Sequence, residues 1–255
     1  MEKITSNQNR RVKAWTKLKT KHGRDNANQY LLEGWHLVSE AIKAEQPIVT
    51  IITTQARLNA DGAAFADQYE CVVVTDEVAK HIADTKTPQG IFAVVTISAS
   101  DQVAANYARG GWLLLDQIQD PGNIGTMVRT ADAMGLQGVV FGAGTASQYA
   151  PKVSRAMQGS QFHVQIAEAD LVEWVNEYHE QGLPVYGTEL NPNAVALNTV
   201  NAQPNFALIM GNEGNGMQSA LLAMTDDNIF IPMKGNAESL NVAVAAGIVM
   251  FHLQK

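Results

Sequence analysis

The sequence has a single cysteine and no long apolar run, and both absences narrow the classes of protein that it can encode. Cys71 stands alone, so no disulfide can form within the chain, which fits a reducing compartment. The longest apolar stretch, Val242–Phe251, is well short of the roughly 20 residues that cross a bilayer, and it predicts a buried helix. Met1–Lys13 is polar and basic and lacks the apolar segment of a signal peptide. We therefore expect a cytoplasmic protein with no membrane partner.

Metal-binding patterns are missing as well. The six histidines form no His-x-x-x-His pair, and one cysteine cannot build a thiolate metal site. The glycine-rich stretch Gly211–Gly216 also lacks the Gly-Lys-Ser/Thr ending of a phosphate-binding P-loop. We therefore expect no metal.

The charge of the chain is unevenly distributed. Its 255 residues carry a net charge of -7. Residues 1–24 hold eight basic side chains against Glu2 alone, a local charge of +7, which leaves -14 for the remainder. Such a segment can neutralise RNA phosphates, although a solvated helix face has the same composition. Trp15 lies among these cations, where it either stacks on a base or anchors its helix to the core. The basic residues predicted to bind RNA here are Arg10, Arg11, Lys13 and Lys17.

The apolar periodicities predict two α/β domains, residues 1–99 and 110–255, with a polar linker at residues 98–102. Hydrophobic residues make up 46% of the chain, enough for two buried cores. The second domain contains five short apolar runs, which are typical of buried parallel strands. In the first domain we expect helices at residues 31–45, 56–69 and 77–83, and strands at residues 48–53, 71–75 and 91–97. In the second domain we expect strands at residues 112–116, 138–142, 183–187, 206–210 and 228–231.

Polar motifs follow three of these strands, and the first is Asp120–Arg129, with the sequence DPGNIGTMVR. Open α/β sheets bind their ligands where the strands end, so this position favours a functional site. Asn123 is expected to cap the helix that follows. Arg129 lies two turns into that helix, where it either serves a ligand or pairs with Asp132 three residues on.

The other two motifs lie near the C-terminus of the chain. Met210–Met217, with the sequence MGNEGNGM, contains three glycines that let the backbone approach a ligand closely, although plain turns look similar. Ile231–Val242, with the sequence IPMKGNAESLNV, leads into the last helix, for which Ser239 is a plausible N-cap. That helix is apolar on most faces, so we expect it to be fully buried or shared with a second subunit.

In this order and spacing, the three motifs resemble those of the SpoU branch of the SPOUT RNA methyltransferases over residues 111–255. Two further segments, Tyr30–Gly34 and Thr87–Ile91, look like the N-terminal RNA-binding domain of that family. The resemblance implies a C-terminal parallel-sheet α/β domain with a trefoil knot, a rare exception to unknotted chains, and a smaller N-terminal α/β domain. It also implies a homodimer and S-adenosyl-L-methionine as the methyl donor.

The same resemblance assigns roles to residues of the motifs. Arg129 matches the catalytic arginine, and since a guanidinium is a poor general base we expect it to clamp a phosphate and stabilise negative charge. Glu213 is available to accept a proton. Lys152 and Arg155 are two of the few cations in the acidic half, so they are expected to contact phosphates unless they are solvated surface charges. The remaining matched catalytic residues are Asn123, Ser239 and Asn241, and the methyl donor is expected at Thr188, Gly211, Ile231, Met233 and Leu240.

The sequence therefore predicts an enzyme that transfers a methyl group to a ribose 2'-hydroxyl of a structured RNA. A protonated hydroxyl is a poor nucleophile, so positioning and alkoxide stabilisation are the main tasks of such a site. The N-terminal domain favours ribosomal RNA, in particular that of the large subunit, over transfer RNA. Two alternatives stay open, a non-catalytic RNA-binding or ribosome-assembly protein with the same fold and a methyltransferase that acts on a nucleobase. Housekeeping modification and antibiotic resistance would use the same chemistry.

Overall fold

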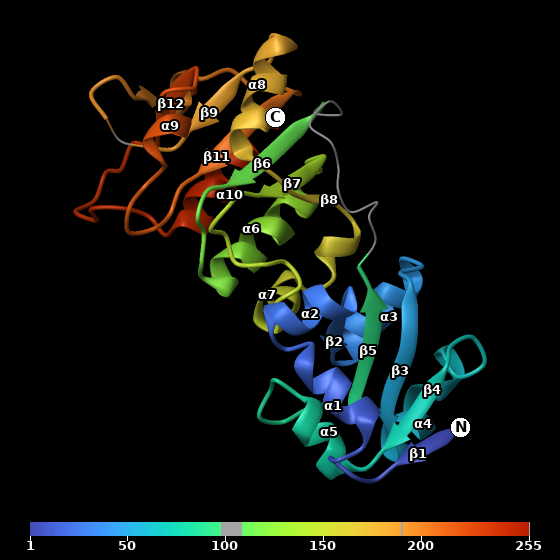
Figure 1. The fold of residues 1–255 in the computed structure, drawn as a ribbon. Coiled ribbons are helices and arrows are strands. Elements are labelled where there is room, and N and C mark those ends of the chain that lie inside the picture. The colour runs from blue at the N-terminus through green and yellow to red at the C-terminus, as the bar shows by residue number, and fades with distance from the viewer. Residues whose placement is uncertain (98–108, 190, 255) are drawn as a thin grey trace. The chain divides into compact units, whose positions relative to one another are not determined.

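The chain folds into two compact α/β units in the computed structural model, which describes residues 1–97, 109–189 and 191–254 (Figure 1). The first unit consists of Met1–Ala99 and Ser147–Phe162, and the second of Ser100–Ala146 and His163–Lys255. Residues 147–162 thus belong to the first unit, although the sequence around them forms the second. The predicted linker at residues 98–102 lies outside the described residues. No helix in the described part of the chain is long and apolar enough to cross a membrane.

The first unit is built on a five-stranded sheet with the order β1-β4-β3-β5-β2. The pairs β1/β4 and β3/β4 are parallel, whereas β5 runs antiparallel to both β3 and β2. Neighbouring residues such as Ile51 and Ile52 enter separate apolar clusters on the two faces, as the alternation of a strand requires. The strands are β1 (Glu2–Ile4), β2 (Gln29–Glu33), β3 (Ile48–Thr54), β4 (Cys71–Val74) and β5 (Ile91–Thr96). The helices are α1 (Arg10–Lys17), α2 (Lys21–Ala27), α3 (Trp35–Lys43), α4 (Gln55–Asp61), α5 (Asp76–Ile82) and α7 (Pro151–Met157), with 3-10 turns η1 (Gly62–Ala64) and η4 (Ser160–Phe162).

Two predicted helices of this unit are wrong in their bounds. The helix expected at residues 31–45 begins only at Trp35, because residues 29–33 pair with β5 and bury Leu31 and Leu32 on opposite faces of the sheet. The helix expected at residues 56–69 ends at Asp61, where Gly62 starts a 3-10 turn. The three predicted strands and the helix at residues 77–83 are confirmed to within about one residue.

The second unit is built on a seven-stranded sheet with the order β10-β12-β9-β11-β6-β7-β8, and every strand pair in it is parallel. This confirms the predicted parallel-sheet α/β fold and all five predicted strands, while two short strands, β8 and β10, were not foreseen. The strands are β6 (Gly111–Leu115), β7 (Gly138–Phe141), β8 (Gln165–Glu168), β9 (Val185–Gly187), β10 (Val195–Ala196), β11 (Phe206–Met210) and β12 (Asp227–Phe230). The helices are α6 (Pro121–Ala133), α8 (Leu171–Glu180), α9 (Ser219–Leu222) and α10 (Val242–Leu253), with a 3-10 turn η5 (Leu197–Thr199).

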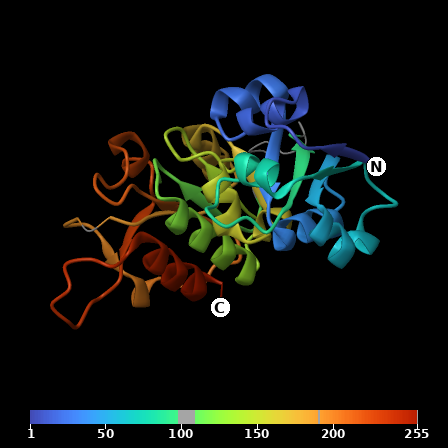
Figure 2. The same cartoon turned by 90° about the horizontal axis from the view of Figure 1, so that it is seen from below.

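Helices cover both faces of the parallel sheet. On one face, α8 inserts Trp174 and Tyr178 into an apolar cluster, with the Trp174 ring 4.4 Å from that of Trp112 in β6. Helices α6 and α10 lie side by side and pack against each other (Figure 2). The sheet is therefore buried on both faces, which explains why its strands read as unbroken apolar runs. Only the strand ends and the loops remain to carry polar chemistry.

Candidate active site

The strand order of the second unit reverses between β6 and β11. From β6 the chain proceeds outward through β7 and β8, whereas β9 and β12 lie beyond β11 on the other side. In open α/β sheets, the crevice at the carboxyl ends of the strands beside such a reversal is where ligands bind. The loops that leave these two strands carry the motifs Asp120–Arg129 and Met210–Met217. The topology thus brings two of the predicted motifs to one place.

Three predicted catalytic residues form a chain of hydrogen bonds at this crevice. The Asn241 Nδ2 group donates to Oδ1 of Asn123 at 2.9 Å, and Nδ2 of Asn123 donates to Oε1 of Glu213 at 2.6 Å. The three side chains come from α6, the loop after β11 and the start of α10. Because Asn123 uses its oxygen toward one neighbour and its NH₂ group toward the other, its amide orientation is fixed. The second carboxylate oxygen of Glu213 makes no hydrogen bond with any described residue.

The two predicted helix caps are each wrong by a few residues. Asp120 caps α6, since its carboxylate accepts the backbone N–H of Asn123 at 2.9 Å, and Pro121 occupies the first helical position, where it needs no N–H partner. Asn241 caps α10 by accepting the N–H groups of Ala243 and Val244 at 2.9 and 3.2 Å. The side chain of Asn123 and that of Ser239 are therefore free of capping roles.

A second set of polar residues fixes the two loops, and sequence reasoning missed it. Asp116 is fully buried at the end of β6 and accepts both the backbone N–H of Gln218, at 2.7 Å, and its Nε2 group, at 2.6 Å. Asn212 donates to the carbonyl of Gln117 at 2.8 Å. Gln117 has a left-handed φ of +57°, an unfavourable conformation for a residue with a side chain. A buried acidic residue directly after an apolar strand was the only signal of this network in the sequence.

Gly211 is required by the tight fold of the loop after β11. A Cβ atom at this position would lie 2.5 Å from the backbone nitrogen of Met217 and 2.6 Å from the carbonyl carbon of Gly216. The Asn212 side chain closes the same turn, as its Oδ1 accepts the N–H groups of Gly214 and Asn215 at 2.9 and 3.2 Å. The loop that holds Glu213 is thus braced from both sides.

A cavity of about 430 Å³ lies beside these residues. Its size and mostly apolar wall are typical of a small-molecule site. Two apolar side chains in its wall, Met233 and Leu240, are 42% and 37% exposed, so they present uncovered apolar surface. Gly211 is not among the residues that line this cavity. Asn241 is the residue directly after Leu240, which does line it. The predicted site residues that line it are Thr188, Ile231, Met233, Ser239 and Leu240.

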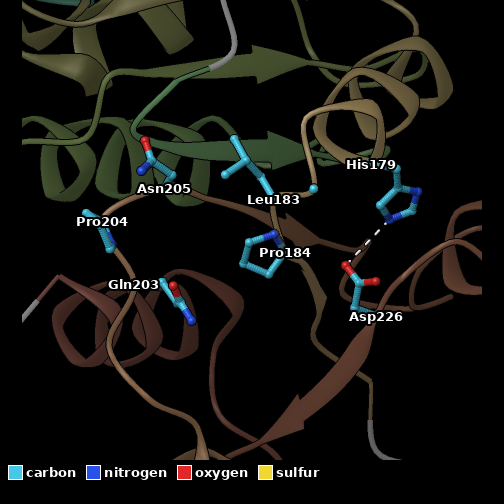
Figure 3. A pocket seen from close by; sticks show the side chains of 8 residues that line it. His179, Leu183, Pro184, Gln203, Pro204, Asn205 and Asp226 are labelled. Carbon is cyan, nitrogen blue, oxygen red and sulfur yellow. Dashed lines mark ion pairs between the residues drawn. The ribbon is translucent and has the colours of Figure 1, made fainter.

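Another cavity, of about 610 Å³, lies at the opposite ends of the strands of the same sheet (Figure 3). It is lined by Pro184 and Asn205, which precede β9 and β11, and by His179 and Asp226, whose Nε2 and Oδ2 atoms are 3.5 Å apart. Because it lies at the amino ends of the strands and contains no residue of the three motifs, the larger cavity is not the candidate active site.

Arg129 stands apart from the hydrogen-bonded residues of its own chain. It is exposed on α6, six residues after Asn123, which places it about 120° around the helix and roughly 9 Å along it. The alternative pairing with Asp132 is not found, because Asp132 lies 3.2 Å from Nδ1 of His163. Within the described residues Arg129 makes no ion pair, so its guanidinium faces solvent.

The cations predicted to bind RNA divide into two groups. Arg10, Lys13 and Lys17 are exposed and follow one side of α1. Arg11, in contrast, is bound to Glu2 at 2.7 Å and to Glu70 at 2.8 Å. Trp15 is 5% exposed and belongs to the core of the first unit, so it anchors α1 and does not stack on a base.

The two cations predicted around residue 150 lie on α7, in the first unit. Lys152 is exposed. Arg155 is held by Asp84 at 2.6 Å and by Glu33 at 3.6 Å. Since both of its neighbours are carboxylates, the guanidinium fixes α7 against the rest of the first unit, and its charge is already paired.

Comparisons with known proteins agree with this site. Residues 112–251 match the model of the SpoU rRNA Methylase family, and residues 9–93 match that of the MRM3-like substrate binding domain. The fold and the site thus define an RNA methyltransferase with an added substrate-binding domain. A curated relative from Bacillus subtilis (strain 168), a 23S rRNA (guanosine(2553)-2'-O)-methyltransferase, is 41% identical over 255 residues, 100% of both chains. The chain belongs to the SpoU rRNA methylase family.

Solved structures share the fold along almost the whole chain. The AdoMet-bound rRNA methyltransferase from Sinorhizobium meliloti has a TM-score of 0.86 at 28% identity, covering 99% of this chain and 97% of that one. The SpoU methyltransferase AviRb from Streptomyces viridochromogenes, solved with AdoMet, has a TM-score of 0.85 at 24% identity and covers 97% of both chains. The predicted α/β fold class is therefore confirmed apart from its trefoil knot, and the family match confirms the predicted family.

Proposed function

We propose that this protein transfers the methyl group of S-adenosyl-L-methionine to a ribose 2'-hydroxyl of large-subunit ribosomal RNA. The observation that carries the proposal is the hydrogen-bonded chain Asn241–Asn123–Glu213 at the reversal of the sheet, beside a cavity suited to a small molecule. The full-length similarity to a 23S rRNA 2'-O-methyltransferase supports the ribose over a nucleobase and the large-subunit RNA over transfer RNA. A ribosomal substrate places the protein in the cytoplasm.

The residues of the cavity fit the proposed methyl donor. Ile231, Met233 and Leu240 offer apolar surface for an adenine ring and a methionine chain. Glu238 is the one acidic residue of the wall and suits a cationic ligand. When bound, S-adenosyl-L-methionine supplies an electrophilic methyl group. Thr188 would support the wall, since its hydroxyl donates to the carbonyl of Ile209 at 3.1 Å, and Gly211 would act through the tight turn that it permits. The trefoil knot around this cavity stays a prediction.

The geometry distributes the work of the reaction among the chain's own residues. The 2'-hydroxyl must lose its proton as it attacks, and the carboxylate of Glu213 would accept that proton. Asn241 orients Asn123, and Asn123 orients Glu213, so both asparagines are positioning residues. Ser239 lies in the cavity wall, where its hydroxyl would bond the ribose or the donor. Arg129 would clamp a phosphate and stabilise the developing negative charge.

We also propose that the protein is a homodimer formed through α10. Val244 and Ile248, four residues apart on one side of this helix, are 50% and 39% exposed, whereas Ala246 and Met250 on the other side are buried. An apolar stripe on a helix is normally covered. A second copy would cover it with the same stripe, as a two-fold interface requires. Since α6 packs beside α10, such a dimer would also enclose the surroundings of Arg129.

In the first unit, the exposed side of α1 would bind the RNA backbone. Arg10, Lys13 and Lys17 provide three positive charges on one side of the helix. Contacts with phosphates position an RNA without reading its sequence. This role suits a domain that presents the RNA to a separate catalytic unit, and Lys152 could add one more contact.

The proposed function is tested by transfer of a radiolabelled methyl group from S-adenosyl-L-methionine to protein-free 23S rRNA from cells lacking this gene. Transfer RNA from the same cells is the parallel substrate. We expect label in 23S rRNA alone, recovered after digestion as a 2'-O-methyl nucleoside. Label in a base, or in transfer RNA, would contradict the proposal. Measurable RNA binding without any incorporation would favour the non-catalytic RNA-binding alternative.

A further inference from the structure

The first unit contains a polar cavity of about 270 Å³ that the methyl-transfer site does not use. It lies where β3 ends and β5 begins, and the turn before β5 is the Thr87–Ile91 segment that resembles the N-terminal domain of the family. All of its lining residues fall within residues 9–93, the range matched by the substrate-binding domain. The residues that determine its chemistry are Thr54, Arg57, Asp76, Lys80, Gln89 and Gly90.

The floor of this cavity is fixed by Gly90 and Gln89. Gly90 has a φ of +76°, and a Cβ atom there would lie 2.7 Å from Oγ1 of Thr54, so no other residue fits without displacing Thr54. The Oε1 atom of Gln89 accepts the backbone N–H of Trp35 at 2.8 Å. This bond fixes the amide, and its NH₂ group has no acceptor within the part of the chain that the structure describes.

The walls offer more hydrogen-bond donors than acceptors. Lys80 is exposed and makes no ion pair with any described residue. The Arg57 guanidinium lies 6.0 Å from the centre of the Trp35 ring, and its Nη1 is 3.1 Å from Asp61. Its buried Nε has no hydrogen-bond acceptor among the residues that the structure describes. Asp76 is the one carboxylate of the lining. A matching ligand therefore carries an anion together with a single hydroxyl or amino donor.

We propose that this cavity binds one nucleotide of the RNA substrate, with its phosphate at Lys80 and its 2'-hydroxyl or a base amino group at Asp76. The volume is slightly below the usual range for drug-sized ligands, about 300–1,000 Å³, which suits a single nucleotide. A phosphate supplies the acceptors that Lys80 and Gln89 lack, and a 2'-hydroxyl is a donor that a carboxylate accepts. The inference rests on the proposed function, because it names where the substrate of that function is held.

Within the first unit, the helix that carries part of the cavity wall packs against α1. Helix α5, which carries Asp76 and Lys80, packs on α1 through a shared core that includes Val12, Trp15 and Val78. The Nζ group of Lys19 ties the two elements together by donating to the carbonyls of His81 and Ala83, at 3.0 and 2.6 Å. The cavity and α1 therefore belong to the same packed body, and the proposal is that both contact the RNA.

The test measures binding of the full-length protein to protein-free 23S rRNA at several salt concentrations. Lys80→Ala is expected to raise the Kd for RNA about three- to tenfold and to lower the slope of log K against log salt by about one. Lys80→Arg, which keeps the charge, should restore the slope. Lys43→Ala is the matched control, because Lys43 is an exposed lysine of the same unit, 71% exposed and paired with Glu40 at 2.8 Å.

The two proposals fail in different ways in this experiment. If Lys80→Ala and Lys43→Ala leave the Kd and the salt slope equally unchanged, the cavity does not bind the RNA backbone, while methyl transfer by the wild type still supports the proposed function. If the wild type binds RNA with the Lys80-dependent slope but transfers no methyl group, the cavity stands and the proposed function fails. A Lys80→Ala defect that Lys80→Arg does not restore would also overturn the phosphate contact.

Discussion

The catalytic polar groups of the second unit are bonded to one another, whereas the cations on the exposed side of α1 in the first unit face solvent and make no ion pair with any described residue. Asn241, Asn123 and Glu213 form one chain of bonds, and the buried Asp116 is held by Gln218. Within the described residues, Lys13 and Lys17 make no such bonds on the side of α1. Chemistry at a single atom needs fixed geometry, while contact with an RNA backbone needs only charge on a surface. Substitutions in the two units should therefore differ in size and in salt dependence.

The largest effect is expected from Arg129→Ala. Loss of a group that stabilises negative charge in the transition state lowers kcat by roughly 10²- to 10³-fold. Binding of S-adenosyl-L-methionine should be nearly unchanged, because Arg129 does not line the cavity. The measurements are single-turnover methyl transfer and calorimetric donor binding. Arg109→Ala, another exposed arginine of the second unit, is the control, and loss of donor binding in Arg129→Ala would contradict the role assigned to this residue.

A smaller effect is expected at Asn241, where two substitutions separate two roles. Asn241→Ser keeps a side-chain acceptor for capping α10 but is too short to reach Asn123. We expect a kcat lower by roughly 10- to 100-fold at nearly unchanged stability, since the positioning of Glu213 is lost. Asn241→Ala should lose the same activity and also about 1 kcal/mol of stability. Thermal unfolding and kcat are measured on both variants to separate the two roles. An equal kcat in Asn241→Ser and the wild type would show that the hydrogen bond from Asn241 to Asn123 does not position Glu213.

Much of the second unit could be predicted from its sequence because the decisive signals there are local. A short apolar run such as residues 206–210 predicts a strand of a sheet that is covered by helices on both faces. The glycines directly after this run predict a loop. The two helix caps were predicted at the wrong residues because each helix has two good capping residues near its start. These are Asp120 and Asn123 for α6, and Ser239 and Asn241 for α10, and only the position of the first helical turn decides between them.

The parts that the sequence did not reveal depend on contacts between distant residues. Arg11 and Arg155 read as free cations, but Glu70 neutralises the first and Asp84 the second across long stretches of chain. Residues 147–162 join the first unit because Tyr149 packs on Tyr30, with ring centres 4.8 Å apart, and because Val153 and Met157 are buried. The strand at residues 29–33 likewise exists only through its pairing with β5.

The proposed dimer is tested by Ile248→Asp. A carboxylate in the centre of an apolar interface is left unpaired and desolvated, so we expect the dimer to dissociate. Light scattering coupled to size-exclusion chromatography reports the mass of each variant. Val172→Asp is the matched control, because Val172 is 36% exposed on α8, away from α10. A monomeric wild type, or a dimer that survives Ile248→Asp unchanged, would show that the exposed side of α10 is not the interface.

The smallest effect is expected on α1, where Lys13→Ala and Arg11→Ala form a contrasting pair on one helix. Lys13 is exposed and makes no ion pair with any described residue, so its removal should weaken RNA binding a few-fold and lower the salt slope by about one. Arg11 is already bound to Glu2 and Glu70, so Arg11→Ala removes no phosphate contact and should leave the slope unchanged. Filter binding of 23S rRNA over a range of salt concentrations measures both. If Arg11→Ala lowered the slope as much as Lys13→Ala, the ion pairs would have to open when RNA binds, and the distinction between paired and unpaired cations in the first unit would no longer hold.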